Sequence, residues 1–297
     1  MKCTKCNKKA VIDSPRLCEK HFIIYFETKI KKTILDYKLI NEGEKIIVGV
    51  SGGKDSLTLL YLLQKWYENV EAISIDEGIG SYREKTLKYA EEFCKRNSIK
   101  WKVYSFKQEF GKTLDEMIQK LKHPCTVCGV LRKYLLNKYS RGYDKLAIAH
   151  NMDDEAESIL MNFLKNNLGI SSRLGPLVGT LRHKKFTLKV KPLYFCSEKE
   201  VITYAKIKGF YHFVGGCPNI AHSFRNKVRS ELKKFENKYP GSVKALVYDF
   251  IKQLPRLKVY FRTDQQLKEC EKCGEPTLKK LCNACLLLEK LKMLKKQ

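Results

Sequence analysis

Strand-like and helix-like segments alternate along most of this 297-residue chain. Short apolar runs typical of buried strands occur at residues 45–50, 70–76, 100–106, 145–150 and 187–193. Helical patterns of apolar residues occur at residues 22–41, 55–67, 82–97, 113–121, 129–140, 154–167 and 197–208. This alternation predicts an α/β fold, a doubly wound parallel sheet with helices on both faces. In such sheets, ligands bind beyond the carboxyl ends of the strands.

The turn after the first strand predicts a phosphate site. It reads SGGKDS and leads straight into a helical pattern. Glycines let backbone N–H groups approach an oxyanion, serine hydroxyls donate hydrogen bonds, and the helix directs its positive end at the charge. The familiar phosphate loop needs Gly, four residues and then Gly-Lys-Ser/Thr. The span from Gly49 to Gly53 is too short for it, and Asp55 follows Lys54.

SGGKDS resembles the PP-loop of the N-type ATP pyrophosphatases. The resemblance implies that six residues wrap the pyrophosphate portion of ATP: Ser51, Gly52, Gly53, Lys54, Asp55 and Ser56. Enzymes of this family cleave ATP between the α and β phosphates and activate a carbonyl oxygen as its adenylate. They include amide-forming synthetases, a tRNA lysidine synthetase and tRNA thiolases, so the loop alone does not identify the nucleophile.

Twelve cysteines in a chain without a signal peptide or an apolar run of membrane length indicate a cytoplasmic metal-binding protein. Two sets have the spacing of a tetrahedral zinc site, with paired ligands two residues apart. The N-terminal set is Cys3, Cys6, Cys18 and His21, and the C-terminal set is Cys270, Cys273, Cys282 and Cys285. Both sets are complete, so we expect two structural Zn²⁺ ions rather than catalytic ones.

Three further cysteines lie near turns, Cys125 and Cys128 in HPCTVCG and Cys217 in GGCPN. Three thiolates from two distant loops are able to hold an iron–sulfur cluster and leave one iron without a protein ligand. Spacing alone leaves two other interpretations open, a redox dithiol and a third zinc site with a non-cysteine ligand. Cys94 and Cys196 are expected to be buried small apolar residues.

The basic excess predicts a polyanionic partner. Lys and Arg total 58 against 32 Asp and Glu, and residues 181–297 hold 27 of the basic residues but only 10 of the acidic ones. Such an excess favours nucleic acid, although solvated lysine-rich helix faces are the alternative. A helical, basic segment spans residues 224–260. Its cluster next to Cys217 is expected to contact phosphates: Arg225, Lys227, Arg229, Lys233 and Lys234.

The motifs together resemble, over essentially the whole chain, the TtuA/NcsA group of tRNA 2-thiouridine synthetases. The matching features occur in the same order: the N-terminal zinc set, SGGKDS, PCTVCG, HNMDDEAE, GCPNIAHSFRNKVR and the C-terminal zinc set. The resemblance implies a [4Fe-4S] cluster on Cys125, Cys128 and Cys217. It also implies that ATP adenylates the C2 carbonyl oxygen of a tRNA uridine, at position 34 or 54, and that sulfur replaces this oxygen. The sulfur comes as sulfide or from the thiocarboxylate of a ubiquitin-like carrier protein.

The same resemblance assigns further roles. The adenine of ATP lies near Gly78 and Ile79, and Asp55 or Asp154 helps to hold Mg²⁺. Arg132 or Lys133 reaches the α-phosphate, and the alternative for both is solvated helix surface. His150 and Asn151 orient the loop that carries Asp153 and Asp154, and one of these acids is able to cap the next helix. Glu155 and Glu157 are interpreted as ordinary first-turn carboxylates.

Four domains are expected: an N-terminal zinc finger (1–24), the PP-loop catalytic domain (25–220), a basic helical tRNA-binding extension (221–264) and a C-terminal zinc finger (265–297). A homodimer is expected, without membrane contact. Three alternatives remain open. They are thiolation through a cysteine persulfide without a cluster, a PP-loop amide ligase that leaves the three cysteines idle, and a non-enzymatic RNA-binding zinc protein.

Overall fold

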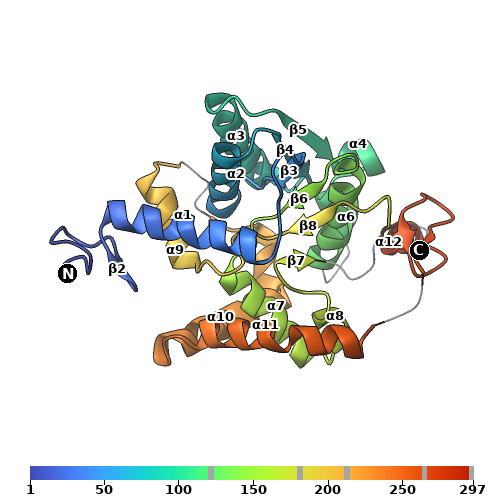
Figure 1. The fold of residues 1–297 in the computed structure, drawn as a ribbon. Coiled ribbons are helices and arrows are strands. Elements are labelled where there is room, and N and C mark those ends of the chain that lie inside the picture. Colours follow the sequence, from blue (N-terminus) through green and yellow to red (C-terminus); the bar gives the residue numbers. More distant parts are fainter. Residues whose placement is uncertain (120–123, 179–182, 211–214, 263–265, 294–297) are drawn as a thin grey trace.

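A computed structural model describes residues 1–119, 124–178, 183–210, 215–262 and 266–293. Its centre is a six-stranded sheet in the order β5-β4-β3-β6-β8-β7 (Figure 1). The strands are β3 (Ile46–Gly49), β4 (Val70–Asp76), β5 (Trp101–Ser105), β6 (Lys145–Ala147), β7 (Leu177–Val178) and β8 (Leu188–Val190). All neighbours pair in parallel except β7 and β8. The chain moves outward from β3 to β5 and then returns to β6, so the strand order reverses between β3 and β6, where such sheets bind ligands.

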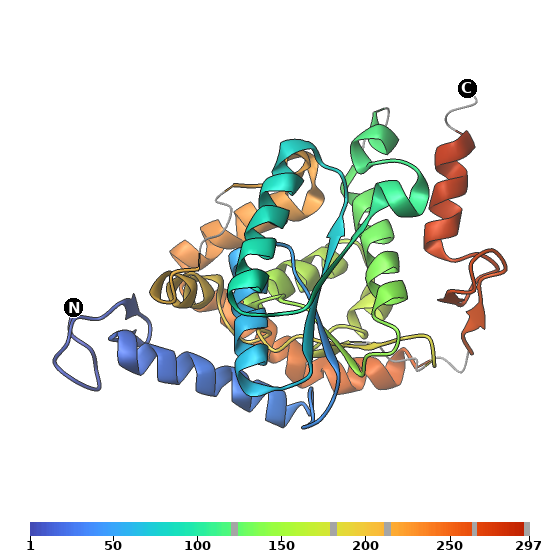
Figure 2. The ribbon, with the colours of Figure 1, turned by 90° about the horizontal axis from the view of Figure 1, so that it is seen from above.

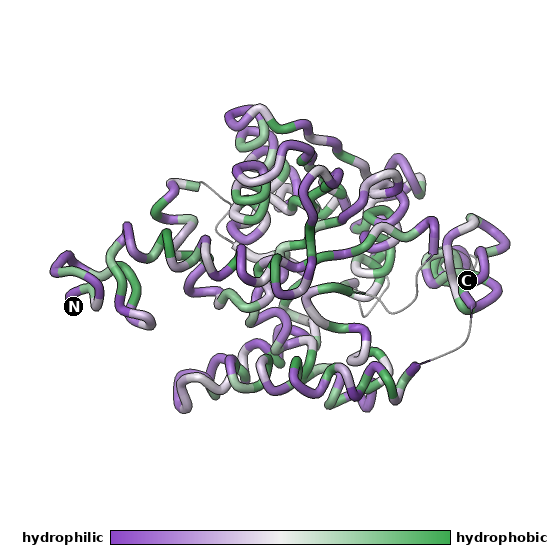
Figure 3. Tube along the Cα trace, in the orientation of Figure 1, coloured by the Kyte–Doolittle hydropathy of each residue, from purple (hydrophilic) through white to green (hydrophobic). Residues whose placement is uncertain are grey.

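Alternate side chains of the central strands face two separate cores, which explains their unbroken apolar sequences. Val48 packs in one core and Ile47 in the other. The first core is covered by α1 (Glu19–Asp36), α2 (Lys54–Trp66), α3 (Gly80–Arg96) and α9 (Glu198–Ile207). The second is covered by α4 (Phe106–Phe110), α5 (Leu114–Ile118) and α6 (Pro124–Tyr139). Apolar residues follow the central strands in Figure 3.

A third core lies under the sheet, where α7 (Met152–Leu164) packs against α11 (Ser242–Tyr260). The other elements of this layer are α8 (Leu168–Ser171), the 3₁₀ turn η1 (Pro218–His222) and α10 (Phe224–Lys238). Figure 1 shows α10 and α11 running along the lower side of the molecule. Only Val228 of α10 is buried, so most of this helix is open to solvent.

Two small modules lie at opposite ends of the molecule in both views (Figures 1 and 2). The first is the hairpin β1 (Ile12–Asp13) and β2 (Arg16–Leu17), which leads directly into α1. The second comprises β9 (Lys268–Glu269), β10 (Pro276–Thr277) and α12 (Asn283–Met293). Its cysteines and Leu291 belong to the same core as α6, so this module is packed onto the sheet domain.

The predicted α/β fold is confirmed, with three local differences. The first helix begins at Glu19 rather than residue 22 and ends at Asp36 rather than 41. Helix α6 begins at Pro124 rather than 129, which places both cysteines of HPCTVCG on a helix. The antiparallel edge strand β7 was not predicted. Residues 120 and 121 of the expected helix 113–121 lie outside the described residues. Within the described part of the chain, none of the helices combines the length and apolar character needed to span a bilayer.

Candidate functional site

The SGGKDS turn closes on itself between β3 and α2. Gly53 is the residue before the first turn of α2, which begins at Lys54. The Ser56 hydroxyl donates to the Gly53 carbonyl over 2.9 Å and accepts from the Ser51 backbone N–H over 3.2 Å. The Gly53 N–H donates to the Ser51 hydroxyl over 3.3 Å. The predicted geometry is therefore present, a compact loop at the N-terminus of a helix, where backbone donors and the helix dipole favour a phosphate.

Gly52 and Gly78 both need glycine for steric reasons. Gly52 has φ of +83°, and a Cβ atom there would lie 1.9 Å from the Thr86 carbonyl oxygen of α3. Gly78 has φ of +67°, and its Cβ would lie 2.5 Å from Cβ of Thr113. Gly78 follows the end of β4, and the side chain of Ile79 is buried. Both loops therefore follow neighbouring strands of the sheet, as the predicted binding of phosphates by one and adenine by the other requires.

Arg83 and Glu77 hold these loops together, and neither residue was predicted from the sequence. The guanidinium of Arg83 is buried and donates to the carbonyl oxygens of Ser51 (2.8 Å) and Ile75 (3.0 Å). Its charge is neutralised by Glu77, 2.8 Å away and also buried. The position of Glu77 one residue after the end of β4 was the available signal, because carboxylates at strand ends face the ligand crevice.

The charged residues of the PP-loop are linked to two other strand ends. The Lys54 ammonium lies 2.9 Å from Asp55 and 3.3 Å from Glu198 of α9. Partial burial lowers the pKa of Lys54, but the two carboxylates outweigh this effect and raise it. The other oxygen of Asp55 accepts from the side-chain amide of Asn151 over 2.9 Å. A lysine held only by carboxylates is able to exchange them for phosphate oxygens when ATP enters.

Asn151 also joins Asp154 to the loop. Its side chain caps α7 by accepting from the Asp154 N–H (3.0 Å), and Asp154 accepts in return from the Asn151 N–H (3.2 Å). In this capping box Asn151 is the N-cap and Asp154 is the third residue of the helix, so the cap is the asparagine rather than one of the predicted acids. Asp153 instead accepts from the Glu198 N–H over 2.7 Å. The two carboxylates predicted to hold Mg²⁺, Asp55 and Asp154, therefore contact the same residue.

The interpretation of Glu155 and Glu157 as ordinary first-turn carboxylates is wrong. Glu155 is completely buried, 2.7 Å from Lys191 and 3.2 Å from His150. Glu157 is also buried and binds Arg229 at 2.5 Å and Arg225 at 3.1 Å. Both side chains point from α7 into the protein rather than into solvent. Burial of the two carboxylates is costly, and it is offset by Lys191, just after β8, and by the two arginines of α10.

The same ion pairs change the expected phosphate-binding cluster. Arg225 and Arg229 are engaged with Glu157, and Lys233 lies 3.0 Å from Glu198. These three side chains therefore attach α10 to the PP-loop domain. Lys227 and Lys234 remain on the exposed side of the helix, where Lys234 forms only a solvent-exposed pair with Glu231. Exposed pairs of this kind are weak and can be replaced by a phosphate.

The three central cysteines lie on adjacent segments. The Cys125 thiol, at the start of α6, donates to the Asn219 carbonyl of η1 over 3.5 Å, and Cys217 immediately precedes η1. Cys128 and Cys217 border the same hydrophobic core and are partly exposed. Burial raises the pKa of Cys128 to about 12 and also raises that of Cys217. All twelve cysteines are free thiols, and Cys94 and Cys196 are buried as predicted.

Among the described residues, two sets of candidate ligands have all their atoms within 4.8 Å of one another, and the three central thiols are not one of these sets. In this arrangement the three thiols do not surround one shared ion. An iron–sulfur cluster does not require that, because each of its thiolates binds a different iron atom.

Arg132 and Lys133 follow the cysteines on α6. Arg132 is half exposed and lies 3.4 Å from Glu77, so it is connected through Glu77 and Arg83 to the PP-loop. Lys133 is exposed and has no ion-pair partner among the residues that the structure describes. Desolvation by surrounding protein and the charge of Arg132 lower its pKa. A lysine in such a position gains from an incoming anion.

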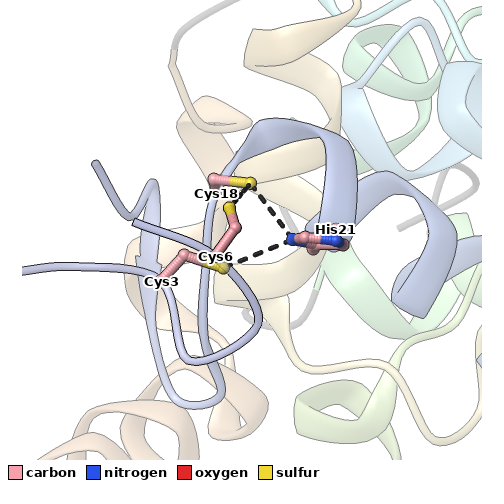
Figure 4. Close-up of side chains that lie close together, drawn as sticks. All are labelled: Cys3, Cys6, Cys18 and His21. Carbon is pink, nitrogen blue, oxygen red and sulfur yellow. Dashed lines mark hydrogen bonds between the residues drawn. The ribbon is translucent and has the colours of Figure 1, made fainter. Parts of the chain in front are cut away.

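The N-terminal zinc set has the geometry of a tetrahedral site (Figure 4). The thiols of Cys6 and Cys18 are 3.6 Å apart, and Nδ1 of His21 lies 3.4 Å from the sulfur atoms of both Cys3 and Cys18. A zinc tetrahedron with bonds of ~2.3 Å to sulfur has edges of roughly 3.8 Å between sulfurs. The ligand atoms therefore already have about the separation that the ion requires.

The C-terminal set is similar. The sulfur atoms of Cys273 and Cys282 are 3.6 Å apart, and backbone N–H groups donate to the thiols of Cys270 (3.3 Å) and Cys282 (3.4 Å). Although burial opposes it, hydrogen bonds from the backbone lower the pKa of Cys270 to about 6. The same combination lowers the pKa of Cys3 to about 6. The pKa values of Cys6, Cys282 and Cys285 are instead raised, so the fit of both sets to Zn²⁺ rests on their ligand types and on the spacing of their ligand atoms.

A parallel sheet with SGGKDS at the N-terminus of α2 defines a nucleotide-binding PP-loop protein. Residues 24–236 match the family model of the PP-loop domain, and the chain belongs to that family. More narrowly, it belongs to the group of PP-loop tRNA 2-thiolation proteins that includes TtuA and NcsA.

Three relatives support the narrower assignment. The tRNA-5-methyluridine(54) 2-sulfurtransferase of Pyrococcus horikoshii is 35% identical, and the match covers 96% of this chain and 93% of that one. The enzyme of the same name from Thermotoga maritima is 32% identical, with 97% and 96% covered. The solved structure of the U34-tRNA thiolase NcsA of Methanococcus maripaludis with its [4Fe-4S] cluster is 32% identical, covers 98% of this chain and 96% of that chain, and has a TM-score of 0.83.

Proposed function

We propose that this protein is an ATP-dependent tRNA 2-sulfurtransferase. It would adenylate the C2 carbonyl oxygen of a tRNA uridine and exchange that oxygen for sulfur, releasing AMP and pyrophosphate. The relatives named as tRNA sulfurtransferases match this chain along nearly its whole length, which supports the proposal. The fold provides an ATP loop and three thiols on neighbouring segments, and these are the two elements that such a reaction needs.

The PP-loop would bind the β and γ phosphates through its backbone N–H groups, Lys54 and the hydroxyls of Ser51 and Ser56. Mg²⁺ would be held by Asp55 or Asp154, since both contact Asn151. Arg132, with Lys133 beside it, would stabilise the charge that develops on the α-phosphate as pyrophosphate leaves. Glu77 keeps Arg132 close to the loop. Adenine would lie against the backbone of Gly78 and Ile79.

Cys125, Cys128 and Cys217 would hold a [4Fe-4S] cluster through three of its irons. When bound, the cluster supplies an iron without a protein ligand, which activates a sulfur nucleophile at neutral pH. Sulfide or a ubiquitin-like thiocarboxylate carrier would be the sulfur source. The persulfide alternative on Cys125 or Cys217 uses the same thiols without iron.

The target uridine is not decided by the relatives' names, which include both position 54 and position 34. We propose tRNA as the substrate, a cytoplasmic location and a homodimer. The free state of all twelve cysteines is consistent with a reducing compartment. Sedimentation at several protein concentrations tests the dimer, and mass spectrometry of tRNA from cells that lack the gene tests the position.

The observation that carries the proposal is the contact between Cys125 and Asn219, which joins the two cysteine-bearing segments. Its test is anaerobic reconstitution with iron and sulfide, followed by incubation with unmodified tRNA, ATP and sulfide. We expect about four iron atoms per chain and 2-thiouridine in the nucleoside digest. Cys217→Ala should lose the thiolation, whereas Cys94→Ala, a buried thiol away from the crevice, should keep it. Full thiolation by Cys217→Ala would refute the mechanism. An iron-free protein that is inactive with sulfide but thiolates tRNA when a persulfide donor is supplied would favour the persulfide route.

A further inference from the structure

A basic groove lies between the edge of the sheet and the C-terminal zinc module. Its volume is about 700 Å³, within the ~300–1,000 Å³ range of ligand sites. Strands β7 and β8 form one wall, α6 contributes Asn137, and the module contributes residues between Pro276 and Asn283. The three central cysteines and the PP-loop do not line it, so this groove is separate from the site described above.

Three cations line the groove without a carboxylate partner. They are Arg173, Lys189 and Lys279, and none of them forms an ion pair with any residue in the described ranges. Basic residues just outside the groove are paired, since Lys185 lies 2.6 Å from Glu269 and Arg141 contacts Glu275. The described lining contains no Asp or Glu. Glu275, just behind the lining, accepts from the Asn137 amide, and its charge acts on Lys189. The uncompensated positive charge is therefore that of Arg173 and Lys279, which favours an anion.

Polar and aromatic groups stand beside these cations. Asn137 is 3% exposed, and its side-chain oxygen has no hydrogen-bond partner in the described structure. An unpaired buried acceptor is costly, so a donor in the groove would stabilise it. Phe186 offers a ring for stacking, and Asn283 offers a second amide. Cations, amide groups and an aromatic ring are the features that recognise a nucleotide, with its phosphate, its base edge and its flat face.

Helix α6 connects the groove to the proposed thiolation site. Asn137 follows Cys128 by nine residues, which corresponds to about 14 Å along a helix. Lys133 lies between them. Burial lowers the pKa of Lys189, and the charge of Lys133 lowers it further. Lys133 is thus an exposed basic residue on α6 between the cysteines and the groove, and an RNA chain that reaches both would pass it.

We propose that this groove binds an unstacked nucleotide of the substrate RNA next to the uridine that is modified. Arg173, Lys189 and Lys279 bind its phosphates, Phe186 stacks on the base and Asn137 accepts a hydrogen bond from the base edge. The inference rests on the proposed function, because it assigns the RNA substrate to a second contact of the same enzyme. It makes the C-terminal zinc module part of an RNA-binding wall.

The test measures binding of unmodified tRNA by the zinc-loaded, full-length protein at several salt concentrations. The main variant combines Arg173→Gln, Lys189→Gln and Lys279→Gln, and Lys88→Gln, an exposed lysine on α3, is the matched control. We expect the triple variant to bind tRNA at least tenfold more weakly at about 0.15 M salt and to lose about two units of salt slope. Phe186→Leu should weaken binding about fivefold. Affinity for ATP should not change in any variant.

Two further arms make the outcome decisive. If the triple variant melts early or loses zinc, the double variant Arg173→Gln with Lys279→Gln replaces it, because both side chains are exposed. The proposal would be overturned if the variants bind tRNA with an affinity within twofold of that of the Lys88→Gln control. This includes the outcome in which the variants bind tRNA normally but no longer bind an acidic protein. A wild-type protein that binds no tRNA would refute the proposed function itself, which is a distinct result.

Discussion

Asn151 and Asp55 are 96 positions apart in the sequence, and the side-chain amide of one donates to the carboxylate of the other over 2.9 Å. Asp55 stands in the first turn of α2, after β3, and Asn151 precedes α7, after β6. Because β3 and β6 are neighbours at the point where the strand order reverses, this bond crosses the ligand crevice. It joins the PP-loop to the HNMDDE turn.

Replacing Asn151 by Asp should separate two roles of this residue. Aspartate keeps a side-chain oxygen that caps α7 but removes the amide donor to Asp55 and places two carboxylates together. We expect nearly unchanged thermal stability and a roughly tenfold higher Michaelis constant for Mg²⁺–ATP, equivalent to ~1.4 kcal/mol. In Asn151→Ala the cap is also lost, which should cost a further ~1 kcal/mol of unfolding free energy. Unchanged ATP kinetics in Asn151→Asp would contradict this assignment.

Gly52→Ala should abolish ATP binding. The new Cβ would overlap the carbonyl oxygen of Thr86, so the loop or α3 must move, in addition to the ~1–2 kcal/mol strain of a positive φ. Gly43→Ala is the matched control, since its φ is +79° and no atom lies within 4 Å of the position that its Cβ would take. Calorimetric titration with ATP should show no binding for Gly52→Ala and normal binding for Gly43→Ala. Normal binding by both would show that the loop is tolerant of displacement.

Glu77→Gln should destabilise the protein strongly. The substitution removes the buried negative charge that compensates Arg83, and breaking a buried pair costs about 3–5 kcal/mol. Glu231→Gln removes a partner from an exposed pair with Lys234 and should cost less than about 1 kcal/mol. Urea unfolding at neutral pH measures both values. A similar small loss for both variants would mean that Arg83 is held by the carbonyls of Ser51 and Ile75 alone.

Part of the loss of stability at low pH should come from protonation of Glu155. Burial opposes ionisation, but the charges of Lys191 and His150 hold the pKa of Glu155 below its ordinary value of 4.5. A carboxyl whose pKa is lowered in the folded state contributes stability above its unfolded pKa and loses this contribution as pH falls through the folded pKa. Urea midpoints measured from neutral pH down to about pH 3 should therefore fall less steeply below pH 4.5 in Glu155→Gln than in the wild type. Parallel curves would assign the acid sensitivity to other groups.

The two zinc modules should respond separately to substitution. Metal analysis should find two Zn²⁺ per chain in the wild type and one in Cys6→Ser and in Cys285→Ser, because each change removes one of four ligands. Both substitutions should lower the melting temperature, because each module contributes side chains to a core of the sheet domain: Ile12 and Leu17 to the first and Leu291 to the second. Unchanged melting temperatures would show that these cores survive without the ion.

The sequence was sufficient for the parts of the fold that depend on local pattern. The apolar runs and helical periodicities located β4 to the residue and the other parallel strands of the predicted set within a few residues, and the cysteine spacings located both tetrahedral sets. Strand β7 was missed because two residues at a sheet edge carry no periodic signal. The start of α6 was missed because the segment with Cys125 and Cys128 was interpreted as a loop, although proline is favoured in a first helical turn.

The candidate site was predicted less completely, because ion pairing between distant elements leaves no trace in a single sequence. Glu157 and Arg229 are 72 positions apart, and their types alone suggested a solvated acid and a phosphate-binding base. The hydrogen bond from the Arg83 guanidinium to the Ser51 carbonyl likewise becomes apparent only once α3 packs against β4, the strand next to β3. The resemblance supplied the roles of single residues, and those of Arg132, Lys133 and Asp154 stay predictions.

The packing of the C-terminal module against α6 links metal binding in the module to the stability of that helix. The helix that bears Cys125 and Cys128 rests on side chains held in place by the far tail of the chain, including Cys270 and Leu291. Under the proposed function, loss of Zn²⁺ from the module would weaken the packing that supports α6, and with it the proposed cluster site, even where iron is sufficient. Binding of iron by α6 would then depend on the supply of both metals.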